Sequence, residues 1–171
     1  MKMRLALAAA LLVPLAALPQ SQPPAAEPYP SARGYDALQG VHDLKMAFDV
    51  TDGNPKALVA KLNTIDTTRR QLIDAGVTPH IVMTFRGDAS YFTQTDLSMV
   101  KEADRDNALK VQAKLRELRA AQGVESLEQC TLPLAGRKLR KEGVMSEVKV
   151  VPNGWIALAR YQQHGYGYIA P

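Results

Sequence analysis

The chain has 171 residues, a formal net charge of +4 and 46% hydrophobic residues. This length and apolar content are typical of one domain with a core of its own. No cluster of Lys and Arg is interleaved with aromatic residues, so the composition argues against nucleic-acid binding.

The first residues have the pattern of a secretory signal peptide. A basic start is followed by an apolar run over residues 5–18 and then by small, proline-rich sequence. The run is short for a bilayer and is interrupted by Pro14, and no cysteine follows it for lipid attachment. We therefore expect a signal peptide over residues 1–26, no stable membrane anchor, and a location in the oxidising bacterial periplasm.

A proline-rich segment follows over residues 27–41. Such a composition buries too little apolar surface to offset the entropy cost of ordering, so we expect a flexible lead-in. The folded domain is expected over residues 42–171.

Strand and helix signals alternate from the start of this domain. Residues 45–50 predict a short apolar strand, and residues 55–75 predict a helix with proline at its first position. Residues 77–85 are rich in β-branched and apolar side chains and predict a second strand. The segment 90–101 is ambiguous and is interpreted as a short helix.

The middle of the domain contains the only cysteine. Residues 104–121 have one apolar stripe and otherwise charged faces, which predicts an amphipathic helix. Residues 124–129 predict a weak strand that ends at Cys130. Thr131 is expected to cap a helix that runs to Gly143, with the basic residues 137–141 on its solvated face.

The last third repeats the alternation. Residues 147–151 predict a strand, residues 155–163 a helix, and residues 166–169 a final short strand. Strands that alternate with helices indicate a parallel sheet covered by helices on both faces.

Sites in open α/β sheets form beyond the carboxyl ends of the strands. The candidates for binding at that edge are glycines, short polar residues and one cation, namely Gly53, Asn54, Arg86, Gly87, Thr131, Asn153 and Gly154. Ordinary turns have the same composition for backbone reasons alone, and this alternative stays open.

Cys130 is the candidate nucleophile. A thiol at a helix N-terminus meets unpaired amide donors and the positive end of the helix dipole, and both favour the thiolate. Arg86 adds positive charge if its loop folds toward the same edge. The alternative is that Cys130 is a small buried hydrophobic residue, and position alone does not decide between the two.

Other chemistries find no support in the sequence. The three histidines have no metal-ligand spacing, and the glycine-rich turns match neither a Walker motif nor a dinucleotide fingerprint, so we expect no metal and no cofactor. The late aromatic residues indicate packing or subunit contacts: Trp155, Tyr161, Tyr166 and Tyr168.

From residue 44 to residue 171 the chain resembles the exported branch of the DsrE/DsrF-like family. The resemblance rests on KMAFDVTDGNPKAL, GVESLEQCTLPLAGRKLRKEGV and, most specifically, VKVVPNGWIALARYQQHGYGYIAP. It implies a three-layer αβα sandwich with a five-stranded, mainly parallel sheet, and homo-oligomers such as trimers or hexamers. In cytoplasmic relatives the cysteine that matches Cys130 carries sulfur as a persulfide. Thr131-Leu132-Pro133 departs from the small polar stretch with Asn that commonly follows that cysteine.

Two functions follow from these observations. The first is a periplasmic carrier of sulfur or persulfide that uses Cys130 and meets a sulfur-donor or acceptor protein. It would be a carrier more than a turnover enzyme. The alternative is a non-enzymatic ligand-binding or assembly domain in which Cys130 is structural.

Overall fold

The structure is a computed structural model that describes residues 30–171, so the expected signal peptide over residues 1–26 lies outside the described residues. Five parallel strands form one sheet in the order β4-β3-β2-β1-β5. The strands are β1 (Asp43–Val50), β2 (Thr78–Phe85), β3 (Val124–Cys130), β4 (Lys149–Val151) and β5 (Gly167–Ile169).

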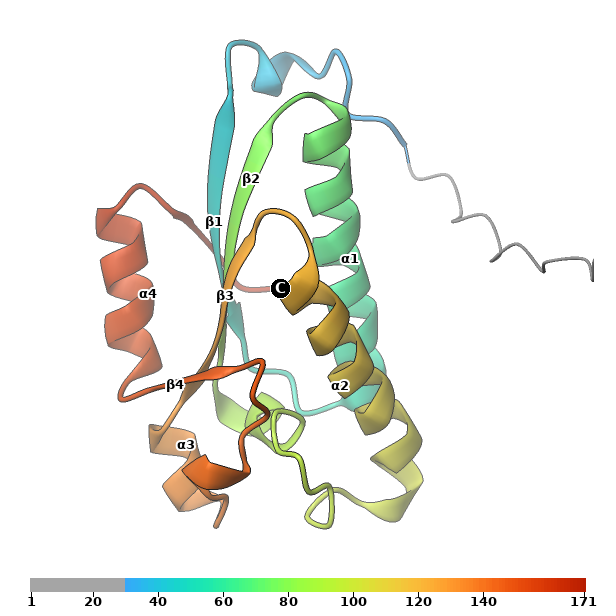
Figure 1. Cartoon of the computed structure of the whole chain (residues 1–171), viewed down its shortest axis with the longest axis vertical. Helices are drawn as coiled ribbons and strands as arrows, with labels where there is room; N and C mark the ends of the chain where they lie inside the picture. The colour runs from blue at the N-terminus through green and yellow to red at the C-terminus, as the bar shows by residue number, and fades with distance from the viewer. Residues whose placement is uncertain (1–29) are drawn as a thin grey trace, which may run out of the picture.

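Helices cover both faces of the sheet, as Figure 1 shows. The α-helices are α1 (Pro55–Asp74), α2 (Arg105–Ala120), α3 (Leu132–Gly136) and α4 (Gly154–Gln163). Short 3-10 turns are η1 (Asp36–Leu38), η2 (Gly87–Tyr91), η3 (Glu102–Asp104) and η4 (Lys141–Gly143). The predicted α/β class, with a five-stranded parallel sheet between helical layers, is confirmed.

Local sequence explains where α1 begins and ends. Asn54 caps the helix, because its side-chain oxygen accepts the backbone N–H groups of Lys56 at 3.0 Å and Ala57 at 3.1 Å. Pro55 occupies the first helical position, where its missing N–H costs nothing. Gly76 follows the helix with a φ of 80°, a conformation that glycine adopts without strain.

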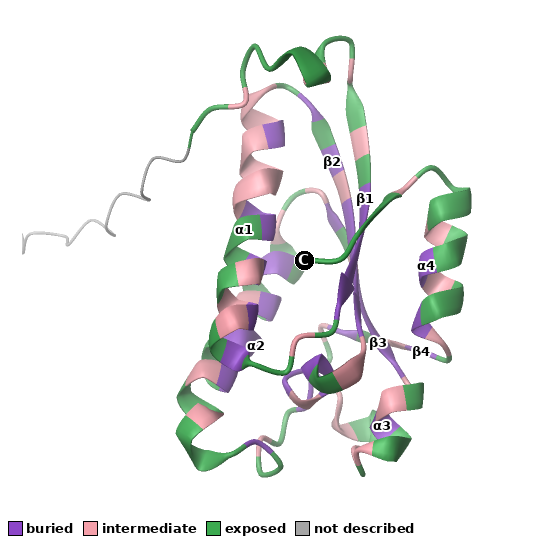
Figure 2. Ribbon diagram, turned by 180° about the vertical axis from the view of Figure 1, so that it is seen from behind, coloured by how far each residue is buried: buried purple, intermediate pink, exposed green. Residues whose placement is uncertain are grey.

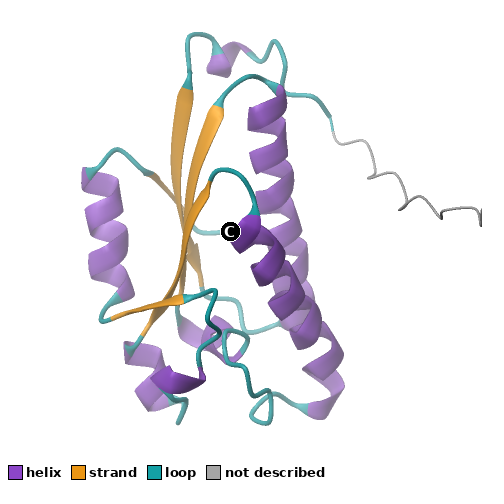
Figure 3. Cartoon of the chain, in the orientation of Figure 1, coloured by secondary structure: helices purple, strands orange, loops and turns teal. Residues whose placement is uncertain are grey.

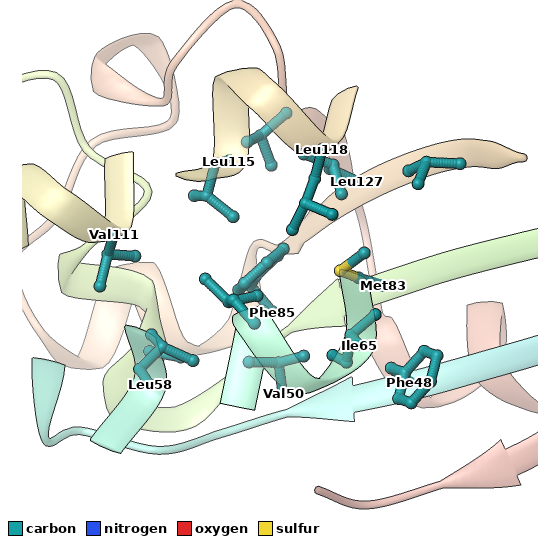
Figure 4. Close-up of a cluster of buried hydrophobic side chains, with 14 of the residues drawn as sticks. Phe48, Val50, Leu58, Ile65, Met83, Phe85, Val111, Leu115, Leu118 and Leu127 are labelled. Atoms are coloured by element: carbon teal, nitrogen blue, oxygen red, sulfur yellow. The ribbon is translucent and has the colours of Figure 1, made fainter. Parts of the chain in front are cut away.

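The main core lies between the sheet and the pair α1 and α2. Figure 4 shows Phe48 and Val50 from β1, Met83 and Phe85 from β2, and Leu127 from β3 facing apolar side chains of the two helices. These side chains alternate along each strand with those of the opposite face. Continuous burial of this face supplies most of the apolar stabilisation.

The opposite face is covered by α4, and its apolar cluster is small. Ala47, Val82 and Leu158 are its buried members, with Tyr161 and Tyr166 packed against them. In Figure 2 the outer side of α4 is exposed, whereas the inner side is buried against the sheet. Polar side chains therefore share this face of the sheet with a few apolar ones.

The segment after Cys130 differs from the prediction. The helix α3 has 5 residues and ends at Gly136, so the expected helix from Thr131 to Gly143 is wrong. Lys138 has a φ of 55°, a left-handed conformation that a helix cannot contain, and the basic residues 137–141 are therefore not one helix face. Thr131 makes no side-chain cap, and its hydroxyl instead donates to the carbonyl oxygen of Pro152 at 2.7 Å.

The segment 90–101 is mostly irregular rather than a short helix. Its first two residues belong to η2 and the rest is drawn as loop in Figure 3, where Gln94 forms an isolated antiparallel bridge with Val144. The fully buried Gln129 holds it in place, because its side chain accepts a hydrogen bond from Thr93 at 2.7 Å and donates one to Ser90 at 2.8 Å. The polar side chain of Gln129 in β3 thus has a structural role, because it fixes the segment 90–101.

The described part of the lead-in contacts the end of α1. Arg33 pairs with Asp74 at 2.9 Å, and the Gln71 side chain donates to the carbonyl oxygen of Pro30 at 2.6 Å. Within residues 30–171, every helix is too short or too polar to cross a membrane.

Candidate functional site

Cys130 is the last residue of β3, and its side chain lies under the first turn of α4. The side chain is buried, with 2% of the residue exposed. The backbone N–H of Gly154 donates to the Cys130 sulfur at 3.1 Å. Asn153 caps this helix by accepting the N–H of Trp155 at 2.9 Å, which leaves the Gly154 N–H available to the sulfur.

The sulfur thus meets a helix N-terminus, but the helix is not the one expected. The sequence pointed to the helix that follows Cys130 directly, whereas the donor belongs to α4, which is 24 residues further along the chain. The carboxyl ends of the adjacent parallel strands β3 and β4 bring the two segments together.

Gly154 allows this close approach because it has no side chain. A Cβ atom at this position would lie 2.7 Å from Cδ of Arg86 and 2.9 Å from Cγ2 of Thr84. Both distances are shorter than a normal van der Waals contact, so any larger residue would push α4 away from β2. Gly154 therefore sets the spacing between the helix N-terminus, Arg86 and Cys130.

Arg86 is held at the same edge by Asp49 and Trp155. Its Nε donates to Asp49 at 2.8 Å and a second guanidinium nitrogen contacts the other carboxylate oxygen. Tyr168 also donates to Asp49, at 2.7 Å, and the Trp155 ring lies over the guanidinium at 5.2 Å from its centroid. The hydrogen bond with Asp49 raises the pKa of Arg86, so its positive charge is permanent, and Cys130 lies within its electrostatic reach.

A buried hydroxyl lies in the same place. Thr84 is fully buried, and its Oγ1 has no hydrogen-bond partner among residues 30–171. The helix amide contacts the sulfur, and the side chains of Arg86 and Thr84 lie against Gly154 beside it. An amide, a guanidinium and a hydroxyl are groups that stabilise negative charge. Chemically, this arrangement suits a thiolate that reacts as a nucleophile.

Comparison with known proteins identifies the family. The family model of the DsrE/DsrF-like family matches residues 28–171. The chain belongs to this family. It is also similar to an uncharacterized protein of Aquifex aeolicus (strain VF5), with 27% identity over 126 residues, 74% of this chain and 55% of the relative. The chain thus spans about half the length of that relative.

A solved structure shares the fold. The structure of a protein of unknown function from Methanobacterium thermoautotrophicum has a TM-score of 0.54 to this chain, with 18% sequence identity. The likeness covers 76% of this chain and 99% of that one. It supports the α/β architecture of this DsrE/DsrF-like protein.

The other residues that the sequence predicted for the site divide into two groups. Asn153 and Gly154 join Cys130 and Arg86, as described above, and Thr131 ties the end of β3 to Pro152.

Gly53, Asn54 and Gly87 lie at the same sheet edge but in another cluster. Asn54 is occupied as the cap of α1, and Gly87 packs against the Thr51 backbone. Gly53 abuts Asp88 and lines a separate pocket with it. Cys130 is not among the residues that line this pocket.

Sequence reasoning missed four residues of this DsrE/DsrF-like site. Asp49 and Thr84 lie on strands and were not named, and Trp155 and Tyr168 were interpreted only as packing or subunit-contact residues. A signal for Asp49 was present, because a carboxylate in an otherwise apolar buried strand requires a partner. Among the described residues, no group of three or more His, Cys, Asp or Glu is placed to hold a metal ion.

Proposed function

We propose that this DsrE/DsrF-like protein carries sulfur as a persulfide on Cys130, in the periplasm. The observation that carries the proposal is the Gly154 N–H directed at the sulfur from the capped N-terminus of α4. An amide donor and the helix dipole favour a sulfur anion, whether thiolate or persulfide anion. Arg86, fixed by Asp49, adds a positive charge to the same place.

The loading step conserves atoms and electrons. The Cys130 thiolate attacks the outer sulfur of a donor persulfide, a bond forms between the two sulfur atoms, and the sulfur–sulfur bond of the donor breaks. The donor leaves as a thiolate and the proton stays on the transferred sulfur. Unloading is the same step in reverse order, with an acceptor thiolate as the attacking group.

Access to the sulfur requires the first turn of α4 to move. Cys130 is 2% exposed, whereas Leu132 at 59%, Trp155 at 66% and Ile156 at 67% are large exposed hydrophobic residues on the segments beside it. These three residues suit contact with a donor or acceptor protein, or with other copies of this chain. We extend the proposal to homo-oligomers, trimers or hexamers. Light scattering of residues 27–171 at micromolar concentration tests this, and a monomer contradicts it.

The carrier role predicts sulfur uptake by the folded protein. After incubation with glutathione persulfide, the intact mass should rise by one sulfur atom, and Cys130→Ser should show no increase. Arg86→Gln should load at least several-fold more slowly, because it removes the positive charge beside the sulfur. Arg140→Gln is the matched control, since Arg140 directly precedes η4, its side chain is 83% exposed, and its ion-pair partner among the described residues is Glu142.

The second candidate is a binding or assembly domain with a structural cysteine, and the burial of Cys130 favours it. It predicts that neither the persulfide nor iodoacetamide modifies Cys130 until the protein unfolds in urea. Modification of the folded protein, at a rate that depends on Arg86, contradicts this candidate and supports the carrier. Export is tested separately, by N-terminal sequencing of the protein from the cell envelope. An intact Met1 in the cytosolic fraction contradicts it.

A further inference from the structure

A groove runs along α4 above β3 and β4, on the face of the sheet opposite the main core. Its volume is about 540 Å³, within the ~300–1,000 Å³ that small-molecule sites occupy. We name it the α4 groove. The lining residues that matter here are Glu128, Lys149, Ile156, Arg160, Tyr161 and Tyr166. Cys130 does not line it.

Glu128 is the unusual member of the lining. It is 3% exposed, and one carboxylate oxygen accepts hydrogen bonds from Tyr161 at 2.7 Å and from Ser126 at 3.3 Å. The other oxygen, Oε2, is buried and has no hydrogen-bond partner within residues 30–171. A buried carboxylate oxygen without a donor is costly, so the site lacks a donor at this point.

Two cations face the same groove. Lys149 is the register partner of Glu128 on the neighbouring strand, and Arg160 lies on α4. Both residues are exposed, and neither side chain forms an ion pair or a hydrogen bond with another described residue. Ile156, Ala157 and Val151 supply apolar wall between the charged groups. The groove thus combines one buried acceptor, two cations without partners, and an apolar surface.

We propose that the α4 groove binds a small zwitterion with an apolar body, of the size and chemistry of an apolar amino acid. Its ammonium group donates to Glu128, its carboxylate contacts Lys149 and Arg160, and its side chain packs on Ile156 and Tyr161. The ammonium then supplies the donor that the buried Oε2 of Glu128 lacks, and the two exposed cations form charge-assisted hydrogen bonds with the carboxylate. The ammonium enters with a small rotation of Tyr161, whose hydroxyl already contacts Glu128. The proposal does not depend on the chemistry of Cys130.

The competing explanation is internal. Because Lys149 and Glu128 are adjacent on parallel strands, a rotation of the Lys149 side chain can place its ammonium on the free carboxylate oxygen. In that case the groove needs no ligand, because Lys149 and Glu128 form an ion pair with each other. Ligand titration separates the two explanations.

The experiment is an NMR titration of ¹⁵N-labelled protein, residues 27–171, with L-leucine, N-acetyl-L-leucine and L-leucinamide. We expect saturable shifts of the amides of β4 and α4 with L-leucine. Acetylation of the amine removes the ammonium, and amidation removes the carboxylate, so each derivative should bind at least tenfold more weakly, as loss of a charged hydrogen bond implies.

The variants assign the groups. Glu128→Gln should weaken L-leucine about tenfold and leave N-acetyl-L-leucine unchanged, whereas Arg160→Gln should weaken L-leucine and leave L-leucinamide unchanged. Glu117→Gln is the matched control, because Glu117 is on α2 with a side chain that is 62% exposed. Circular dichroism establishes that each variant is folded. If Glu128→Gln is not, Lys149→Met tests the carboxylate contact instead, and it should weaken L-leucine and leave L-leucinamide unchanged.

The outcomes are distinct. Cys130→Ser should bind L-leucine as the natural protein does. Loss of sulfur uptake therefore does not imply loss of L-leucine binding, and the two proposals can fail separately. Absence of saturable shifts with L-leucine overturns the proposal and leaves the Lys149–Glu128 pair as the explanation. Equal binding of L-leucine by Glu128→Gln and the natural protein also overturns it.

Discussion

The two faces of the sheet bury different kinds of groups. Under α1 and α2 the buried apolar cluster is large, and the buried Asp66 and Gln129 have polar partners, whereas Nε2 of the buried Gln94 beside α2 has none among the described residues. Under α4 the apolar cluster is small, and Asp49, Thr84 and Glu128 are buried beside it. Thr84 and Glu128 each retain a polar atom without a described partner.

One face of the sheet mainly stabilises the domain, and the other holds the polar groups of the candidate sites. Alternation along each strand sends successive side chains to opposite faces, so a strand can serve both purposes at once. In β3, Gln129 faces the irregular segment that it holds, while Glu128 and Cys130 face α4. We infer that the α4 face can hold buried polar groups beside few apolar ones because the other face supplies most of the apolar burial that stabilises the domain.

The largest expected effect is on the apolar face, tested by one substitution made on each side. Leu62→Ala on α1 removes a fully buried side chain from the large cluster and should lower the free energy of unfolding by about 4–5 kcal/mol. Leu158→Ala on α4 removes a side chain from the small cluster, which has more freedom to collapse, and should cost about 2–3 kcal/mol. Urea unfolding of both variants measures the difference. Equal costs would contradict the comparison.

A smaller effect is expected from the buried charge between α1 and α2. Asp66 is 2% exposed and contacts Arg69 at 2.8 Å, Arg70 at 2.9 Å and Lys114 at 2.8 Å. Asp66→Asn should lower the free energy of unfolding by about 3 kcal/mol at pH 7, because it leaves the cations without their carboxylate. Glu117→Gln, which removes an exposed partner of Lys114, is the control and should cost less than about 0.5 kcal/mol.

The pH dependence of Asp66 has a definite sign. Burial acts to raise its pKa, but the hydrogen bonds from Lys114 and Arg69 outweigh burial, and the pKa lies below its ordinary value of 3.8. The contribution is therefore present above pH 3.8 and is lost as the pH falls further. The stability difference between the natural protein and Asp66→Asn should narrow between about pH 4 and pH 2. A constant difference over this range would contradict the assignment.

The next effect concerns the close approach of Gly154 to Arg86 on the α4 face. Gly154→Ala places a methyl group 2.7 Å from Cδ of Arg86, and Asp49 limits how far Arg86 can move away. We expect a loss of about 1–2 kcal/mol in urea unfolding, together with faster iodoacetamide labelling of Cys130 as the first turn of α4 moves outward. Gly136→Ala, at a position with open space, is the matched control. Slower labelling in Gly154→Ala would contradict the inference that the first turn of α4 shields the Cys130 sulfur from solvent.

Much of the fold was predictable because its signals are local. The alternation of strands and helices, the proline that opens α1 and the glycine that ends it need only a few neighbouring residues. The helix after Cys130 was predicted too long, because the left-handed conformation of Lys138 has no residue-type signal such as glycine. Local propensity does not report a conformation that tertiary packing imposes.

The site was predictable in its residues but not in its contacts. Cys130, Arg86 and Gly154 were all named from their places at strand ends. The donor to the Cys130 sulfur is the N–H of Gly154 and not a group of the helix that Thr131 begins. This contact depends on the strand order, which places β4 and the start of α4 beside β3. The contact between Asp49 and Arg86 joins a residue of β1 to the residue that follows β2, and it too requires the register of the sheet.

At the amino-terminal edge, His80 lies between two carboxylates. Its ring nitrogens contact Glu125 at 2.7 Å and Asp43 at 3.1 Å. The hydrogen bond with Glu125, and then that with Asp43, raises the pKa of His80 above its ordinary value of 6.5. A raised pKa means that the folded state holds a proton that the unfolded state releases, so the contribution is full below pH 6.5 and is lost as the pH rises.

This is the smallest predicted effect, because all three side chains are partly exposed. His80→Gln should lower the free energy of unfolding by less than about 1 kcal/mol at pH 5.5, where the histidine is charged in both states and the pairing contributes fully. The cost should decline between pH 6.5 and pH 8.5 as the folded protein loses the proton. His42→Gln is the control, since no ion pair or hydrogen bond joins its ring to a carboxylate among the described residues. Urea unfolding at pH 5.5 and pH 8.5 measures both variants. If the cost of His80→Gln were the same at the two pH values, the carboxylates would not act on the histidine, and this edge of the α4 face would be no more than solvated surface.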